Sequence, residues 1–212
     1  MRYFRDVATL ARKDLLLELR ARDTVPAMLL FVVAALVVFH FALPADSSDL
    51  AAYGLLWVAL VFTALLGLVR SFSAERDQGL LDGLVLAPCD RSAIWLAKAL
   101  AMLAFLVLAE IVALPAFAIF FTGIGWKTVA GVALANLGIC AVGTLLAAMA
   151  AASRARELLL PLLFLPLAIP IVVGGVGAGV VEDGGRYLGL LAVYDAIFAI
   201  ICWASFEYVV TE

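Results

Sequence analysis

Residues 25–43 read VPAMLLFVVAALVVFHFAL, a run without a single aspartate, glutamate, lysine or arginine. Such a run is typical of a helix that crosses the hydrocarbon core of a bilayer, which needs about 20 apolar residues. Further long apolar runs follow it along the chain, at residues 50–69, 94–121, 129–152, 158–181 and 187–210. The sequence therefore predicts an all-α membrane protein with six transmembrane helices.

The composition excludes an ordinary soluble domain. Of the 212 residues, 67% are hydrophobic and 15% are charged, and the mean hydropathy is +1.16. Soluble domains are nearer half apolar and a quarter charged, so in water this chain would expose large apolar patches. The net charge is −3 and no run of basic residues suggests nucleic acid, which leaves lipid as the expected surroundings. The spans leave no room for a soluble domain, so residues 1–212 are expected to form one transmembrane domain.

The basic residues are distributed unevenly between the two sides of the membrane. All of them except Lys127 and Arg186 precede the first span or lie between spans two and three or four and five, when Lys98 in the first turns of span three is counted with the loop before it. Lysine and arginine concentrate in cytoplasmic loops, and the opposite loop 44–49 contains two aspartates and no base. We therefore expect a multi-pass protein of the bacterial inner membrane with both termini in the cytoplasm.

Residues 1–23 are expected to form an amphipathic helix in the cytoplasmic interface. At 100° per residue its apolar face comprises Phe4, Val7, Ala8, Ala11, Leu15 and Leu19. Asp14 and Glu18 lie within this face, four residues apart. Two interpretations are open. Glu18 pairs with Arg22 while Asp14 reaches solvent, or both acids contact a neighbouring helix or subunit, because acids against lipid are costly.

The longest internal cytoplasmic segment, residues 70–91, reads RSFSAERDQGLLDGLVLAPCDR. It predicts a short helix with a charged start and a leucine-rich end that stops at Pro88. Leucines exposed on such a segment favour a protein partner, and the alternative is a helix lying on the membrane surface.

Within the spans, Glu110, Asn136 and Asp195 are the polar residues of interest. An ionisable side chain inside the membrane is costly and suggests function. Asn136 is placed to hydrogen-bond to either acid. Two interpretations are open for the acids: an interhelical hydrogen bond made by a neutral carboxyl, or a proton-relay or substrate-path role.

The fifth span contains three prolines and a glycine run at residues 174–179. Because proline removes a backbone donor and kinks a helix, we expect this helix to break before it crosses fully, with a simple kinked span as the alternative. An interruption near Pro115 is expected in the third span for the same reason. Trp95 and Trp126 are expected at the membrane interfaces.

Nucleotide and metal sites are not expected in this chain. It contains no G-x-x-x-x-G-K-[ST] motif, so ATP would have to bind to another chain. Its single histidine, His40, lies near the outer end of the first span and is a poor candidate for a haem ligand on its own. We expect no metal site and no directly bound cofactor.

The cytoplasmic segment resembles the coupling region of ABC-2-type exporter permeases in the ordered set Glu75, Gly79, Leu80, Gly83, Leu84, Pro88, Arg91 and Lys98. Together with residues 12–20 and the proline-bearing stretch 158–170, it is similar more narrowly to the CcmB family, permeases of the haem-exporter ABC complex of cytochrome c maturation. The resemblance covers nearly the whole chain.

That resemblance implies an ABC-2 (type V exporter) fold, in which an elbow helix precedes six spans and the fifth span ends in re-entrant short helices. It implies a homodimer on two ATPase subunits, with haem-handling membrane subunits and a haem chaperone as further partners. ATP would be bound by the ATPase and haem by the partner proteins, so this chain would not itself be an enzyme. The elbow residues would be Asp14 and Glu18, and the ATPase-coupling residues would be Glu75, Arg76, Gly79, Leu80, Leu81, Asp82 and Gly83.

Other functions stay open on the sequence. One is an ABC-2 permease for lipid, polysaccharide or drug. Another is a proton-coupled secondary transporter that uses Glu110 and Asp195, which predicts internal inverted repeats that are not evident. A non-transporting scaffold would not need the leucine-bearing segment. An intramembrane enzyme is disfavoured because H-E-x-x-H and G-x-S-x-G are both missing.

Overall fold

The computed structural model describes residues 2–44, 47–71, 90–151, 153 and 156–211. This part of the chain is helical and contains no strand. Its helices are α1 (Arg2–Ala21), α2 (Thr24–Ala42), α3 (Asp49–Arg70), α6 (Arg91–Phe120), α7 (Trp126–Ala151), α8 (Arg156–Val180) and α9 (Gly185–Thr211). The last six are long and apolar enough to cross a membrane, which confirms the predicted six-span all-α fold.

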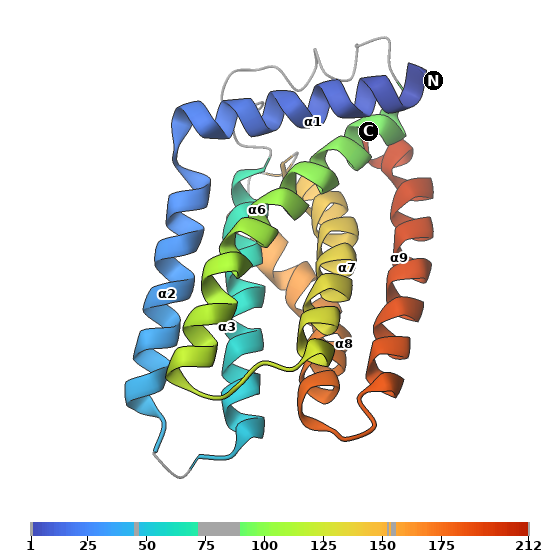
Figure 1. Ribbon diagram of the computed structural model, residues 1–212. Helices are drawn as coiled ribbons and strands as arrows, with labels where there is room; N and C mark the ends of the chain where they lie inside the picture. Colours follow the sequence, from blue (N-terminus) through green and yellow to red (C-terminus); the bar gives the residue numbers. More distant parts are fainter. Residues whose placement is uncertain (1, 45–46, 72–89, 152, 154–155, 212) are drawn as a thin grey trace.

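The helix α1 lies across one end of the bundle, and both chain termini are at that same end (Figure 1). We call this the α1 end and the opposite one the far end. Val7 of α1 is buried against Ala93 and Ala97 in the first turns of α6, where small side chains let the two helices approach closely. Phe4, in contrast, is 73% exposed, so only part of the predicted apolar face of α1 turns toward the bundle.

The helices α3 and α7 are the inner elements of the bundle and have the largest buried share. Between them they contact every other span. The outer spans present leucine, isoleucine and valine on their exposed sides, as expected of surfaces that face lipid. Small residues line α7, including Gly131, Gly138 and Gly143, and such residues allow close packing where lipid gives helices no hydrophobic reason to associate.

The break expected in the fifth span is wrong, because α8 continues as one helix from Arg156 to Val180. Its glycines serve packing rather than helix termination: a side chain at Gly175 would collide with the indole of Trp57 on α3, and one at Gly179 would meet Tyr53. The Tyr194 hydroxyl of α9 donates a hydrogen bond of 2.9 Å to the Leu167 carbonyl. This hydrogen bond joins α9 to the proline-bearing part of α8.

Two smaller expectations are also corrected. The helix α6 runs through Pro115 without interruption, from Arg91 to Phe120. Trp95 is not an exposed interface anchor: it is buried, and its indole N–H donates a bond of 3.2 Å to the Ala141 carbonyl of α7. Trp126 is 71% exposed at the start of α7, as an interfacial tryptophan would be.

Candidate functional site

The predicted ATPase-coupling residues, Glu75 to Gly83, lie outside the described residues. The structure does describe where that segment leaves α3, at Ser71, and where it enters α6, at Asp90. Both points lie at the α1 end of the bundle. The contacts around them form a polar joint that connects α1, α2, α3 and α6.

Lys98 is the centre of this joint. It is only 5% exposed, although it lies two turns inside an apolar helix. Its Nζ is 3.2 Å from Asp14 Oδ2 on α1 and donates a bond of 2.8 Å to the Ser71 carbonyl at the end of α3. One buried ammonium group therefore holds three helices together.

Asp14 is correspondingly well enclosed. Its side chain is 11% exposed and lies 3.1 Å from Lys13 as well. The structure thus favours the interpretation in which this acid contacts a neighbouring helix over the one in which it reaches solvent. The neighbouring helix is α6 of the same chain, and docking of another subunit at Asp14 stays a prediction.

Glu18 caps the next helix instead of pairing with Arg22. Its Oε1 accepts hydrogen bonds from the backbone N–H groups of Thr24 (2.7 Å) and Val25 (2.9 Å). These are among the first amides of α2, whose own N-cap residue, Asp23, makes no side-chain cap bond. A carboxylate at this position satisfies unpaired donors and interacts favourably with the helix dipole. Arg22 adopts a φ of 56° in the tight turn between the two helices.

The residues at the two ends of the predicted coupling segment also form hydrogen bonds with other helices. Arg70, the last residue of α3, donates from Nη1 to the Asp23 carbonyl at 2.6 Å. At the other end, Asp90 Oδ1 accepts from the Ser92 backbone N–H at 3.0 Å and caps α6. The Ser92 hydroxyl lies 3.2 Å from the Tyr3 hydroxyl of α1. The residues that flank the segment therefore make contacts that reach α1, α2 and α6.

Replacing Glu18 with alanine is expected to lower the free energy of unfolding by about 1 kcal/mol, because two helix-start amides lose their acceptor. Glu18→Gln keeps a carbonyl oxygen and should retain most of that stability. Reversible unfolding in mixed micelles of mild detergent and SDS measures both. An alanine variant as stable as the parent would show that the cap contributes nothing.

The intramembrane polar residues separate into a pair and a single acid. Asn136 Nδ2 of α7 donates a bond of 2.8 Å to Glu110 Oε2 of α6, and both side chains are buried. Asp195 on α9 is also buried, but neither of its carboxyl oxygens has a hydrogen-bond partner among the described residues. Asn136 therefore pairs with Glu110, and Asp195 is left alone.

His40 lies exposed in the last turn of α2, at the far end of the bundle. Its ring is in contact with aromatic rings at centroid distances of 5.4 Å (Phe41), 5.3 Å (Phe120) and 5.7 Å (Phe121). Among the described residues no three His, Cys, Asp or Glu side chains come together as a metal site. The ring contacts that the structure gives His40 are with phenylalanine, which is not a ligand of haem iron.

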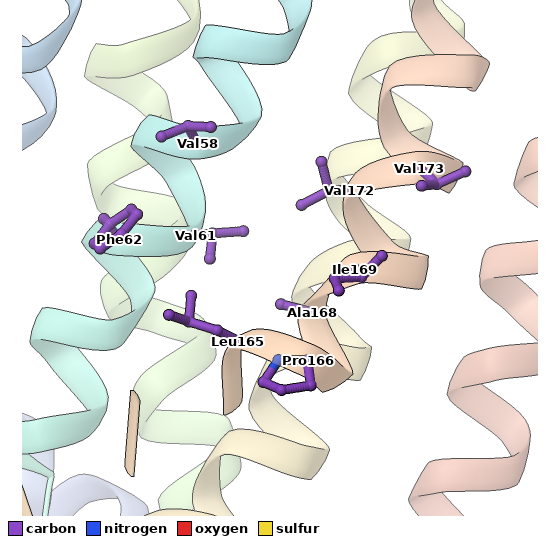
Figure 2. A pocket seen from close by; sticks show the side chains of 9 residues that line it. All are labelled: Val58, Val61, Phe62, Leu165, Pro166, Ala168, Ile169, Val172 and Val173. Carbon is purple, nitrogen blue, oxygen red and sulfur yellow. The ribbon is translucent and has the colours of Figure 1, made fainter. Parts of the chain in front are cut away.

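A groove of about 420 Å³ lies between α3 and α8 (Figure 2). Its walls are entirely apolar: Val58, Val61, Phe62, Leu165, Pro166, Ala168, Ile169, Val172 and Val173. The groove has no polar group to recognise a carboxylate or an iron atom.

Sequence reasoning missed two features of this site. The charge distribution treats Lys98 as a loop residue, yet a lysine inside an apolar span and an aspartate, Asp14, within an apolar helix face together indicate that the two side chains meet. The groove is lined by exposed residues four apart, such as Val58 and Phe62 on α3. Because every face of a transmembrane helix is apolar, the sequence does not distinguish the residues that line a groove from those that face lipid.

Comparison with known proteins gives a consistent result over this whole architecture. A sequence model of the CcmB protein family matches residues 5–209. The chain is 29% identical over 205 residues to Heme exporter protein B of Bradyrhizobium diazoefficiens, covering 94% of this chain and 90% of that one. It is 33% identical over 175 residues to Heme exporter protein B of Pseudomonas aeruginosa, covering 80% and 78%. It is 31% identical over 172 residues to that of Paracoccus denitrificans, covering 78% of each.

The match spans nearly all of α1, the six long apolar helices and, apart from Tyr3, the residues of the polar joint. The predicted resemblance is confirmed over nearly the full length, and this multi-pass membrane protein belongs to the CcmB protein family.

Proposed function

We propose that this chain is the membrane permease subunit of a haem-export ABC transporter that serves cytochrome c maturation. The observation that carries the proposal is the family match over residues 5–209, with relatives named Heme exporter protein B. The apolar six-span bundle is consistent with a transport role. In this proposal the subunit lies in the bacterial inner membrane with both termini in the cytoplasm.

The proposed mechanism is mechanical coupling. A separate ATPase subunit binds ATP and docks on residues 75–83, and its closure displaces the coupling segment. Ser71 and Asp90 flank that segment, and the polar joint connects them to α1 and to three spans through Lys98, Arg70 and Ser92. Because the Lys98–Asp14 contact is short and buried, it would make the elbow helix move with α3 and α6 rather than slide over them.

Haem is assigned to the partner proteins in this proposal. In the described part of the chain His40 belongs to no group of three His, Cys, Asp or Glu side chains, and the groove between α3 and α8 is wholly apolar. The subunit would act as a homodimer with two ATPase subunits, together with haem-handling membrane subunits and a haem chaperone. ATP hydrolysis would then drive the release of the haem-loaded chaperone through motion of this subunit.

Copurification from native membranes tests the proposal. A tagged chain extracted in mild detergent is expected to recover a small ATPase with a Walker motif, and the Glu75→Lys, Asp82→Lys double variant should lose it. The matched control is a charge reversal at Glu182→Lys, in the exposed turn between α8 and α9, which should retain the ATPase. Failure to recover any ATPase in several mild detergents would contradict the coupling role.

A further inference from the structure

Asp195 is an unpaired acid in the interior of the membrane bundle. It is 9% exposed, and both of its carboxyl oxygens are buried without a hydrogen-bond partner among the described residues. The carboxyl group fills a notch in α7 where residue 138 is glycine: a Cβ at that position would lie 2.6 Å from Asp195 Oδ1. The contact between α7 and α9 is therefore shaped around this side chain.

No ion pair of Asp195 exists among the described residues, and the nearest basic residue along α6, Lys98, is engaged with Asp14 and Ser71 at the α1 end. The sequence contains no lysine or arginine at residues 99–126, 128–153 or 187–212, which include the membrane-embedded parts of α6, α7 and α9. The stretch 158–181 of α8 contains no titratable residue at all. An ionised carboxylate here would be buried without any compensating charge, which is among the costliest arrangements in a membrane.

Several polar side chains of α7 and α9, the two helices that meet at Asp195, are engaged elsewhere or are weak hydrogen-bonding groups. On α9, the Tyr194 hydroxyl donates to the Leu167 carbonyl, and Cys202 is a free buried thiol. On α7, Asn136 is bonded to Glu110 of α6, and Cys140 is likewise a free buried thiol. Hard metal cations need several oxygen ligands, and no group of three acidic or ligating side chains exists in the described residues. A hard metal cation is therefore not expected to bind here, and a proton is the ligand that a single carboxyl group can bind on its own.

We propose that Asp195 is a proton-binding site within the membrane, neutral while α9 packs against Gly138 and ionised when the two helices separate and water reaches it. In water an aspartate is ionised at neutral pH, whereas in the closed notch neither carboxyl oxygen of Asp195 has a hydrogen-bond partner in the described part of the chain. Separation of α7 and α9 would then release one proton, and their closure would take one up. The inference does not rest on haem, on ATP or on any partner subunit.

Infrared spectroscopy of the full chain in lipid vesicles tests the resting state. At neutral pH the Asp195→Asn variant is expected to lose a carbonyl stretching band of a protonated carboxylic acid, with no loss of carboxylate absorption. Glu110→Gln is the matched control: it changes another acid buried to the same extent and should keep the band that Asp195→Asn loses. Loss of carboxylate absorption in Asp195→Asn would overturn the proposal.

Labelling with dicyclohexylcarbodiimide tests the exchange of the proton. This apolar reagent takes up the acid proton and adds the carboxyl oxygen to its central carbon, and the adduct rearranges to a stable N-acylurea. We expect mass spectrometry to find the adduct on Asp195, with a rate that falls about tenfold per pH unit above the titration point. A rate independent of pH, or no adduct at any pH, would overturn reversible protonation. Both readouts are independent of ATPase binding, so they can fail while the proposed function holds.

Discussion

Replacing Lys98 with methionine is expected to lower the free energy of unfolding by about 3 kcal/mol, the lower end of the cost of removing one partner of a buried ion pair, because Asp14 keeps Lys13 at 3.1 Å. The side chains of Lys98 and Asp14 are only 6% and 11% exposed, so water does little to screen the remaining carboxylate. The Ser71 carbonyl also loses its 2.8 Å donor. Methionine keeps the length and volume of the side chain, which limits the effect to charge and hydrogen bonding.

The double variant Asp14→Asn, Lys98→Met separates the pair energy from packing. Because a buried pair contributes little net stability compared with neutral residues of similar size, the double variant should regain most of what the single variant loses. Unfolding in mixed detergent micelles measures all three proteins. A double variant as unstable as Lys98→Met would show that Lys98 acts through Ser71 rather than through Asp14.

Replacing Gly175 with alanine is expected to cost about 1–3 kcal/mol, the usual range for overpacking a well-packed interior. The added methyl group would collide with the six-membered ring of Trp57, a side chain that is 1% exposed and cannot swing aside. The helices α3 and α8 would have to separate, which also changes the groove beside them. Thermal unfolding of the purified chain in detergent measures the loss.

Two further variants make the Gly175 result interpretable. Gly189→Ala on α9 adds the same methyl group where nothing lies within 4 Å, so it should leave stability unchanged or raise it slightly. Adding Trp57→Leu to Gly175→Ala should restore part of the stability relative to Trp57→Leu alone, because the smaller side chain makes room. A Gly175→Ala protein as stable as Gly189→Ala would contradict the close contact between α3 and α8.

The six spans could be predicted because the bilayer imposes the same demand on every one of them. A run such as residues 25–43 has to be apolar over about 20 positions, and this requirement is local and readable. The structure starts and ends α2 at Thr24 and Ala42, within one residue of that run. An even number of spans also places both termini at one end of the bundle, as Figure 1 shows.

Predictions from the local sequence were wrong where a residue type acts differently in a solvent-exposed helix and in a packed membrane bundle. The glycines of α8 would weaken a solvent-exposed helix, yet against Trp57 and Tyr53 they allow close helix contact, and the helix does not break. Trp95 is a residue type that is common at membrane interfaces, but its side chain points into the bundle, where the Ala141 carbonyl on α7 accepts a hydrogen bond from its indole N–H. Such outcomes depend on which neighbour a helix face meets.

The sequence by itself determined the class of the protein, its spans, the amphipathic elbow helix and the family, because hydropathy and ordered motifs are properties of the chain. Only the tertiary structure decided the pairings: Lys98 with Asp14, Glu18 with the start of α2, and Asn136 with Glu110. It also showed that Asp195 lies in the notch at Gly138 with no partner among the described residues. These pairings are set by the rotation and depth of each helix, and those follow from how small and large side chains fit between helices, which no single span encodes.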